Sequence, residues 1–356
     1  MQSIFQALEQ AFKEAGRVLT AAHIAPDGDA VGSAAALAHI ALHFGCETRI
    51  LLDIGRGGHP VLTLPAPVVS GCAELEGFVP DLVVFADCGD AARAGAEMQP
   101  LIKSGGFPGT DGIRPLIVDI DHHAGNPEYG RINLVRPERA ATAELVGLFA
   151  EYLGLPLSGG LGEAVYLGLV TDTGNFTFSN TTADCLGMAA RIVAAGLDVA
   201  DFTRRADNNW SLARMRLWGK LMNSVTLHAG GAVSCCLVRK EWLDAAGLGS
   251  EDLEGFASRL RCLKGVRVGL FIREEAGRKC RVSLRSMSDF DVRRPAALFG
   301  GGGHASAAGA TLNVGPDEAA RILLKELEAE LRNQSISRGK AGQRSRRSQQ
   351  IKIGEC

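Results

Sequence analysis

The sequence predicts an α/β protein with a parallel-sheet N-terminal domain and a smaller α+β C-terminal domain. Strand-like apolar segments alternate with helical segments over about the first 210 residues, a pattern typical of a parallel sheet covered on both faces. Beyond that point, paired strands are joined by glycines and interspersed with helices. The length of 356 residues is consistent with two domains.

Four buried strands form the core of the predicted N-terminal domain. Short apolar runs place them at residues 18–22, 47–52, 82–86 and 115–118. Helices are expected at residues 3–15, 34–44, 140–153, 162–171, 182–195 and 198–207. Gly- and Pro-rich sequence predicts loops over residues 53–80 and 100–115.

The predicted C-terminal domain begins after a helix near residues 211–222. Strands are expected at residues 225–228, 232–238, 266–273 and 280–286, and helices at 250–262, 291–299 and 316–332. The last segment, residues 333–356, is rich in Ser, Gln, Arg and Lys and contains almost no apolar residues, so we expect a disordered basic tail. The segment is either a solvated tail or a weak electrostatic aid to binding a polyanion.

Composition excludes several classes of protein. The formal net charge of −2 argues against a strongly basic nucleic-acid-binding protein, so any affinity for phosphate must come from a local site. The nine cysteines show neither a C-x-x-C pair nor zinc spacing, which predicts reduced core thiols in a cytoplasmic protein. No apolar run approaches the ~20 residues that span a bilayer, so we expect no membrane association.

Acidic and histidine side chains follow the predicted strands where each strand ends. His23, Asp27 and Asp29 lie in the turn after the first strand, and Asp87 follows the third. Asp121, His122 and His123 end the fourth strand, and Asp172 lies in a glycine-containing turn after a helix. Because the carboxyl ends of parallel strands share one edge of a sheet, we expect these groups to converge.

Each of these residues also has an ordinary structural interpretation. Asp29 and Asp87 could each be a helix N-cap, Asp172 could cap a turn, and the two adjacent histidines could belong to a surface loop. The convergence favours a metal site, since several carboxylates and imidazoles gathered in one place would repel and desolvate one another without cations. A pair of divalent cations resolves that cost, and Mn²⁺ accepts mixed nitrogen and oxygen ligands.

Together these motifs resemble the DHH phosphoesterase superfamily. The resemblance runs through His-x-x-x-Asp-x-Asp-Ala-x-Gly-Ser from residue 23, then Asp87, then Asp121-His122-His123, then Thr171-Asp172-Thr173-Gly174. Ser283-Leu284-Arg285-Ser286 and the segment from Phe299 to Gly309 resemble the DHHA1 substrate-binding domain. The length and the two-domain layout are similar to the short NrnA-like branch.

The resemblance implies two Mn²⁺ sites, in which Mg²⁺ or Co²⁺ can replace Mn²⁺. His23 and Asp27 would bind the first ion, Asp29, His122 and Asp172 the second, and Asp87 both. His123 and Asp87 would be the catalytic residues, and His123 would face the substrate phosphate or the leaving group. Asp121 would orient His122 or its loop.

The C-terminal domain is expected to bind substrate. Four consecutive glycines at 300–303 can present backbone N–H groups to an anion, and Arg285 can bind a phosphate bidentately. Arg285, Gly301, Gly302, Gly303 and His304 are the candidate substrate-binding residues, although a glycine run can also be a flexible turn.

These assignments predict four segments. They are a DHH metal-binding catalytic domain over residues 1–195, a helical linker over 196–222, a DHHA1 substrate-binding domain over 223–332, and the tail over 333–356.

The resemblance implies hydrolysis of short RNA oligonucleotides (nanoRNA) to mononucleotides and removal of phosphate from a nucleoside bisphosphate, 3′-phosphoadenosine 5′-phosphate. A cyclic or linear dinucleotide phosphodiesterase and a RecJ-like single-strand exonuclease remain alternatives. A regulatory nucleotide-binding module with a degenerate site is another, but no metal-type position is replaced. The oligomeric state stays open, with a homodimer among the options.

Overall fold

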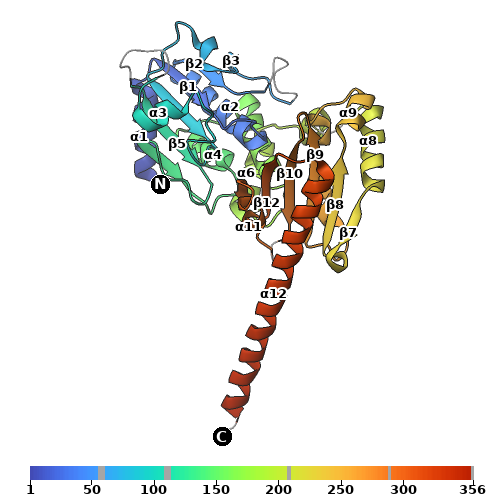
Figure 1. The fold of residues 1–356 in the computed structure, drawn as a ribbon. Helices are drawn as coiled ribbons and strands as arrows, with labels where there is room; N and C mark the ends of the chain where they lie inside the picture. The colour runs from blue at the N-terminus through green and yellow to red at the C-terminus, as the bar shows by residue number, and fades with distance from the viewer. Residues whose placement is uncertain (55–60, 108–113, 207–209, 288–289, 354–356) are drawn as a thin grey trace. The chain divides into compact units, whose positions relative to one another are not determined.

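The computed structural model describes residues 1–54, 61–107, 114–206, 210–287 and 290–353, without the side chains of Ser104, His304 and residues 335–353. The chain folds as two compact units, residues 1–209 and 210–356 (Figure 1). The predicted helical linker over 196–222 is divided between them: α7 (Val199–Ala206) belongs to the first unit and α8 (Leu212–Asn223) to the second.

The first unit is built on a six-stranded, fully parallel sheet in the order β3-β2-β1-β4-β5-β6. The strands are β1 (Arg17–Ala21), β2 (Glu47–Leu51), β3 (Val68–Val69), β4 (Leu82–Ala86), β5 (Leu116–Asp121) and β6 (Ile132–Val135). The four predicted strands are confirmed, and β3 and β6 are additional. The chain reverses its direction of sheet growth between β1 and β4, which is the switch point where open α/β sheets bind ligands.

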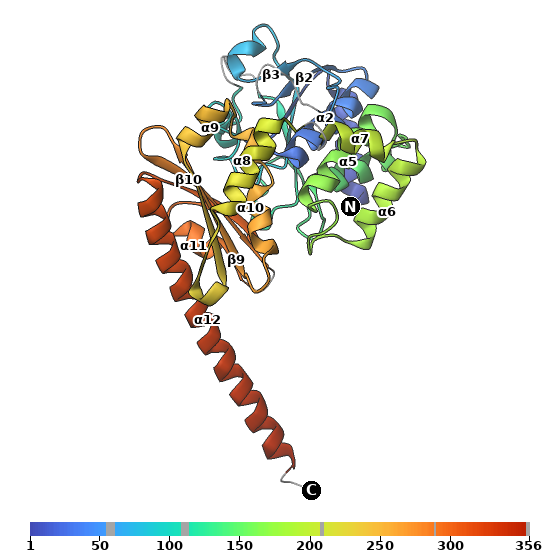
Figure 2. The same cartoon turned by 90° about the vertical axis from the view of Figure 1, so that its right-hand side faces the viewer.

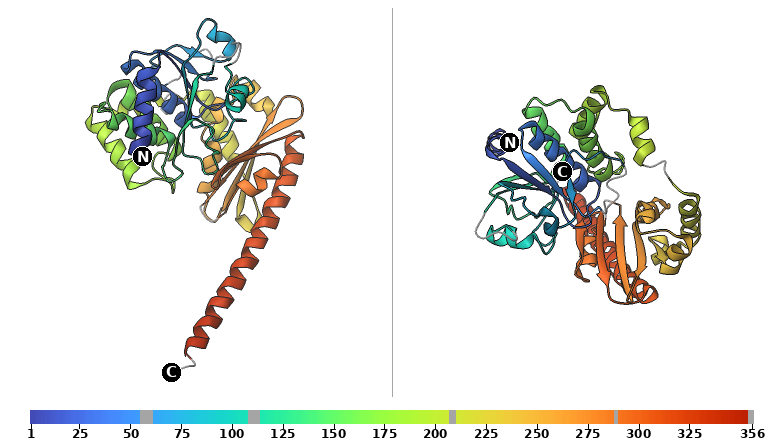
Figure 3. Two further views of the ribbon diagram at one scale, coloured as in Figure 1. Left: turned by 90° about the vertical axis from the view of Figure 1, so that its left-hand side faces the viewer. Right: turned by 90° about the horizontal axis from the view of Figure 1, so that it is seen from above.

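Helices cover both faces of this sheet, as expected (Figure 3). They are α1 (Gln2–Glu14), α2 (Gly28–His43), α3 (Gln99–Ser104), α4 (Thr142–Tyr152), α5 (Gly159–Asp172) and α6 (Ala183–Ala194), with a 3₁₀ helix at Cys72–Leu75. The main core joins α1, α2, α4, α5 and α6 to one face, and a smaller core with Met98 and Leu101 covers the other. The prediction of a loop over 100–115 is therefore wrong at its start, where α3 has proline in its first turn, a position that helices tolerate.

The second unit is a mixed sheet in the order β11-β12-β10-β9-β8-β7. Its strands are β7 (Thr226–His228), β8 (Val233–Val238), β9 (Val268–Glu275), β10 (Lys279–Ser286), β11 (Gly302–His304) and β12 (Ala307–Leu312). Among its described strands, β8 and β9 are the one pair that runs in parallel. The predicted helix over 250–262 is broken into α10 (Phe256–Arg259) between 3₁₀ turns at Glu251–Leu253 and Leu260–Cys262.

Successive strand residues of this second sheet face two separate cores. Cys235 packs with the apolar side of α12, whereas its neighbour Cys236 packs with α8, α9 (Lys240–Ala246) and α10. Figure 2 shows α12 and α8 on opposite sides of the sheet. A short helix, α11 (Arg293–Ala297), precedes β11, and further 3₁₀ residues lie at Ala229–Gly231.

The C-terminal segment differs from the prediction of a disordered tail over 333–356. Helix α12 begins at Pro316 and continues to Ile353 (Figure 1). Arg, Lys and Gln have favourable helix propensity, so a polar composition alone does not exclude a helix. None of the described helices is long and apolar enough to cross a membrane. The eight cysteines in the described residues are free, as predicted.

Candidate metal centre

The loop between β1 and α2 presents the first cluster. Asp27, not Asp29, caps α2: its Oδ1 accepts the N–H groups of Asp29 and Ala30, each at 3.1 Å. The N-cap interpretation of Asp29 is therefore wrong, because the helix begins two residues earlier. His23 is buried and its Nδ1 lies 2.8 Å from the carbonyl oxygen of Ile24, so Nδ1 carries the proton and Nε2 is free to act as a ligand.

Asp29 is held by a helix from far along the chain. It is fully buried, and its two oxygens accept the N–H groups of Thr142 at 2.7 Å and Ala143 at 2.9 Å, at the start of α4. The Ser33 hydroxyl adds a third hydrogen bond at 3.2 Å. These donors at the N-terminus of α4 fix the position of the Asp29 carboxylate.

Asp87 occupies the centre of the cluster. It directly follows β4, is 2% exposed, and adopts a left-handed backbone with φ of 56°. Non-glycine residues rarely hold that conformation, and such strain tends to concentrate at functional sites. The Thr142 hydroxyl donates to Oδ1 at 3.0 Å. Oδ2 lies 3.7 Å from Nε2 of His23, and Oδ1 lies 3.6 Å from Nε2 of His122. The two oxygens of Asp87 thus face two different histidines.

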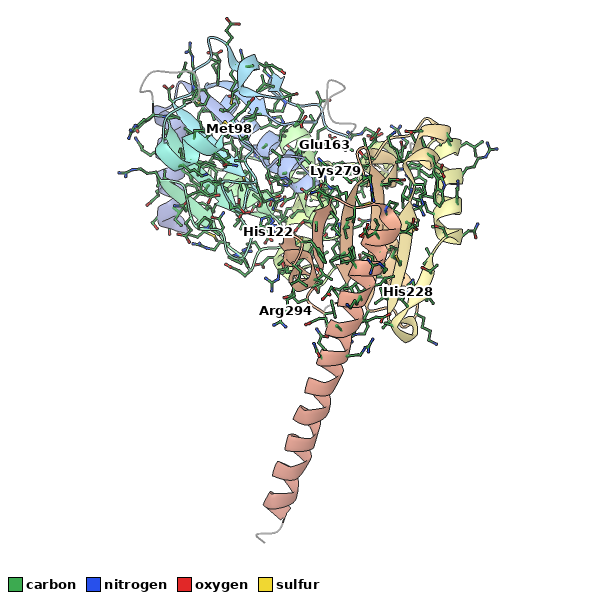
Figure 4. The ribbon with its side chains drawn as sticks, viewed as in Figure 1. Met98, His122, Glu163, His228, Lys279 and Arg294 are labelled. Atoms are coloured by element: carbon green, nitrogen blue, oxygen red, sulfur yellow. The ribbon has the colours of Figure 1, made fainter. Side chains whose placement is uncertain are left out.

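His122 (labelled in Figure 4) faces three carboxylates. Its Nδ1 lies 3.2 Å from the carbonyl oxygen of Arg139, which leaves Nε2 directed at the cluster. Nε2 lies 3.8 Å from Asp29, 3.6 Å from Asp87 and 3.5 Å from Asp172.

Asp172 is the last residue of α5, and one asparagine fixes its position. Asn180 donates through Nδ2 to the backbone carbonyl of Asp172 at 3.1 Å and to that of Ala140 at 2.9 Å. The same Nδ2 lies 3.4 Å from Oδ2 of the Asp172 carboxylate. Gly174, Asn175 and Phe176 then turn with positive φ. This tight turn ends the helix at the cluster.

His123 shares Asp87 with His122, at 3.5 Å from Nδ1, but its hydrogen bonds go to other residues. Its Nδ1 donates to Oδ1 of Asp121 at 2.7 Å, and Asn126 donates to the other oxygen of that carboxylate at 2.7 Å. Asp121 therefore contacts His123 directly, and through Asn126 it also contacts the loop that carries His122, the second role that the sequence analysis gave it. The reason is local: Asp121 and His123 are two residues apart on an extended chain and share a face. Arg93 donates to Nε2 of His123 at 3.0 Å.

The donor atoms fall into groups suited to metal ions. Three sets of ligand atoms lie within 4.8 Å of one another: His23 with Asp27 and Asp87, Asp29 with His122 and Asp172, and Asp87 with His122 and His123. The imidazole-to-carboxylate distances in the first two sets, 3.5 to 4.0 Å, are too long for hydrogen bonds. Two ligands each about 2.1 Å from one ion are separated by roughly this amount.

One buried atom supports the same conclusion. Nε2 of His23 has no hydrogen-bond partner among the described residues, although it is buried. A buried nitrogen left without a partner costs about 1–3 kcal/mol, which a ligand between it and the facing carboxylates would offset. The residues therefore fit divalent cations, with Asp87 shared by two of the three donor sets.

Burial and mutual repulsion shift the pKa values of the carboxylates and of His122 in this cluster. Burial raises the pKa of Asp29 well above its ordinary range and the charge of Asp87 adds to this effect, while burial likewise raises the pKa of Asp87. Burial raises the pKa of Asp172 to about 7, against the attraction of His122. Burial alone would lower the pKa of His122, but Asp172, Asp29 and Asp87 raise it to about 9. Divalent cations would relieve this repulsion.

His123 experiences opposing influences. Burial lowers its pKa, but the hydrogen bond to Asp121 and the charge of Asp87 raise it on balance. The contact with Arg93 acts in the other direction, since a guanidinium only donates and therefore needs an unprotonated Nε2. Asp121 keeps a lowered pKa despite its burial, because His123 and Asn126 donate to it.

The predicted substrate-binding residues lie in the second unit. Arg285 is half-buried in β10 between Gly269 of β9 and Ala307 of β12, and donates to the carbonyl of Leu284 at 3.1 Å. Gly302, Gly303 and His304 form β11 at the edge of the sheet. The side chain of His304 lies outside the described residues.

The glycine run is therefore partly a strand, and its second half is not the flexible turn that the sequence also allowed. Gly302 pairs with Gly309, and Gly303 pairs with Ala308. A Cβ on Gly301 would lie 2.1 Å from the carbonyl oxygen of Gly309, whereas one on Gly302 would meet open space. Close packing against β12 thus explains Gly301, and sheet pairing uses part of the backbone that the sequence analysis assigned to an anion.

Sequence reasoning missed several residues that hold the cluster. Thr142, Arg139 and Asn180 contact ligands from α4, the loop before it and the loop after α5. Arg93 contacts His123 from the loop after β4. The spacing of Arg93 six residues after Asp87 was the one local signal, since both lie beyond the end of the same strand.

Fold and site together define a parallel α/β domain that carries at its switch point a cluster of carboxylates and histidines able to hold metal ions. Residues 17–169 match the DHH family, N-terminal domain, and residues 234–333 match the DHHA1 domain. The chain belongs to the DHH family, with a DHHA1 domain, and within it to the NrnA-like branch.

Two relatives and one solved structure illustrate this membership. A Thermus thermophilus protein named bifunctional oligoribonuclease and PAP phosphatase NrnA is 32% identical over 89% of this chain and 90% of its own length. The Bacillus subtilis protein of the same name is 27% identical over 85% and 90%. The crystal structure of an exopolyphosphatase-related protein from Bacteroides fragilis has the same fold, with a TM-score of 0.81, 24% identity, and coverage of 93% of this chain and 98% of that chain.

Proposed function

We propose that this chain is a metal-dependent phosphoesterase that hydrolyses short RNA oligonucleotides to mononucleotides and removes phosphate from 3′-phosphoadenosine 5′-phosphate. The observation that carries the proposal is the pair of donor groups on either side of Asp87. The names of the relatives supply the substrate classes, oligoribonucleotide and PAP.

We assign the ligands of two Mn²⁺ ions as the sequence predicts. His23, Asp27 and Asp87 would hold one ion, and Asp29, Asp87, His122 and Asp172 the other. Divalent cations at such a site activate water for attack at phosphorus and neutralise charge that develops on the phosphoryl oxygens.

Backbone carbonyls and one carboxylate determine which nitrogen of each histidine carries the proton. The carbonyls of Ile24 and Arg139 hold the protons of His23 and His122 on Nδ1, so that both Nε2 lone pairs face the carboxylates. Asp121 holds the proton of His123 on Nδ1 in the same way. His123 would thus face the phosphoryl group or the leaving oxygen with Nε2, which would carry a proton in place of the Arg93 contact in order to donate to either oxygen.

The DHHA1 domain would bind the far end of the substrate. Arg285 and the backbone of Gly301 to Gly303, with His304, are the residues we assign to this role. A site that holds a terminal phosphate favours short substrates, which agrees with a net charge of only −2.

The test is a series of substrates of rising length. The full chain with Mn²⁺ is given 3′-phosphoadenosine 5′-phosphate, a 5′-phosphorylated RNA dinucleotide, a 5-mer and a 24-mer, and product release is measured. A rate that falls steeply with length supports the proposal. A 24-mer cleaved as fast as the dinucleotide would place the chain with processive single-strand exonucleases, and turnover of cyclic dinucleotides alone would favour a dinucleotide phosphodiesterase.

A further inference from the structure

Arg93 is a guanidinium at the metal centre that neither the sequence motifs nor the comparisons assign. It lies in the loop that follows Asp87, is half-buried, and donates through Nη1 to Nε2 of His123 at 3.0 Å. Among the described residues, that imidazole is the one side chain to which the Arg93 guanidinium is hydrogen-bonded. No salt bridge joins Arg93 to a carboxylate of the described residues.

The backbone of Arg93 is hydrogen-bonded within its own loop, which follows Asp87, and to the loop that carries His23. Oδ1 of Asp90 accepts the N–H groups of Ala92 at 2.7 Å and Arg93 at 3.1 Å, which forms a tight turn. The carbonyl of Arg93 accepts the N–H of Ile24, next to His23, at 2.8 Å. These bonds hold the backbone of Arg93 beside the cluster, and the contact with His123 orients its guanidinium.

Arg139, a second arginine beside the cluster, differs from Arg93 in that its guanidinium is paired with carboxylates. Arg139 donates through Nη1 to Glu144 at 2.7 Å and to Asp184 at 2.8 Å, and its carbonyl accepts from His122. Its charge is therefore neutralised by carboxylates. Arg93 instead contacts a group that carries no negative charge, and most of its five N–H donors remain available.

We infer that Arg93 binds the non-bridging oxygens of the phosphoryl group that is cleaved, beside His123. A guanidinium presents parallel N–H donors that match phosphate oxygens, and it is weakly hydrated compared with an ammonium group. The inference rests on the proposed function in one respect, because that function supplies the phosphoryl ligand. Arg93 would then be a substrate-binding residue of the first unit.

The test measures binding of inorganic phosphate and of AMP, a product of both proposed reactions, to the full chain loaded with Mn²⁺. Isothermal titration calorimetry compares wild type with Arg93→Gln and Arg93→Lys. The control is Arg131→Gln, which removes the same charge from an exposed position just before β6. We expect Kd for phosphate to rise about 10- to 100-fold in Arg93→Gln and less in Arg93→Lys, with no change in the control.

Titration of the same variants with Mn²⁺ alone separates ligand binding from structural damage. Unchanged Mn²⁺ affinity in Arg93→Gln supports the inference. Wild-type phosphate affinity in that variant would overturn it, and so would equal losses of phosphate and Mn²⁺ binding, which would mean that Arg93 only holds the loops together. A wild-type protein that binds no phosphate would also overturn it. A wild type that binds phosphate through Arg93 but hydrolyses none of the substrates would contradict the proposed function alone.

Discussion

The Asp172→Asn variant should be more stable than wild type without metal. With metal bound, it should be less stable than wild type. Asp172 is largely buried, with 20% of its side chain exposed, and Oδ2 lies 3.5 Å from Nε2 of His122. Burial raises its pKa from the usual 3.8 to about 7. Ionising this group in the empty site therefore costs free energy that the amide of Asn does not.

The size and the pH range of the effect follow from that shift. About three pKa units correspond to roughly 4 kcal/mol, which is an upper limit because His122 shares the charge. Below about pH 4 the carboxyl is protonated in the folded and the unfolded chain alike. Its ionisation then contributes nothing to the free energy of unfolding, so wild type and variant do not differ in this respect. As pH rises from about 4 to about 7 the unfolded chain loses its proton first and wild type loses stability, and above about 7 the difference stays constant.

The assay is thermal unfolding in EDTA and in Mn²⁺ over this pH range. At pH 8 in EDTA the variant should unfold on the order of 10 °C above wild type at most. Saturating Mn²⁺ should raise the midpoint of wild type more than that of the variant, because binding to the folded state alone adds stability. A variant that is no more stable in EDTA would refute the electrostatic argument, and an equal response to Mn²⁺ would remove Asp172 from the ligands.

Two further predictions use contacts that the sequence did not reveal. Thr142→Val removes the hydroxyl that donates to Asp87 at 3.0 Å, so Mn²⁺ affinity should fall about 10- to 100-fold in a metal titration, and an unchanged affinity would count against this support. Gly301→Ala should lower stability towards urea by about 1–3 kcal/mol, because its Cβ would meet Gly309, whereas Gly302→Ala should leave stability unchanged; equal effects of the two would contradict the packing.

The parts of the fold and site that the sequence predicted share a physical basis. The strand β4 is buried on both faces, so its apolar run stands out locally. The convergence of His23, Asp87 and His122 follows from parallel strands alone, since their carboxyl ends meet at one edge. By contrast, β6 is only four residues long and its first two residues are only partly buried, so its sequence carries no comparable signal.

The supports of the ligands could not be read from the sequence for a different reason. The bond from Thr142 to Asp29 joins residues 113 positions apart, and it depends on where α4 packs. Nothing near Thr142 distinguishes it from an ordinary helix start. The same is true of Asn180, which reaches Asp172 only because the chain turns back after α5.

Asp121 provides a final test, because its two hydrogen bonds suggest two different roles. The carboxylate is buried and ionised, and it accepts from His123 and from Asn126 at 2.7 Å each. If its role is to keep the proton of His123 on Nδ1, then Asp121→Asn should lower kcat about 100-fold and shift its pH profile, while Mn²⁺ and phosphate still bind.

If Asp121 instead mainly fixes the loop through Asn126, then Asn126→Ala should reproduce every effect of Asp121→Asn, including a loss of Mn²⁺ binding, because the same loop carries His122. Steady-state kinetics and metal titrations of the two variants side by side distinguish these roles. A kcat defect confined to Asp121→Asn assigns the carboxylate to His123. Since only His123 and Asn126 donate to this carboxylate among the described side chains, the two variants together cover its described contacts.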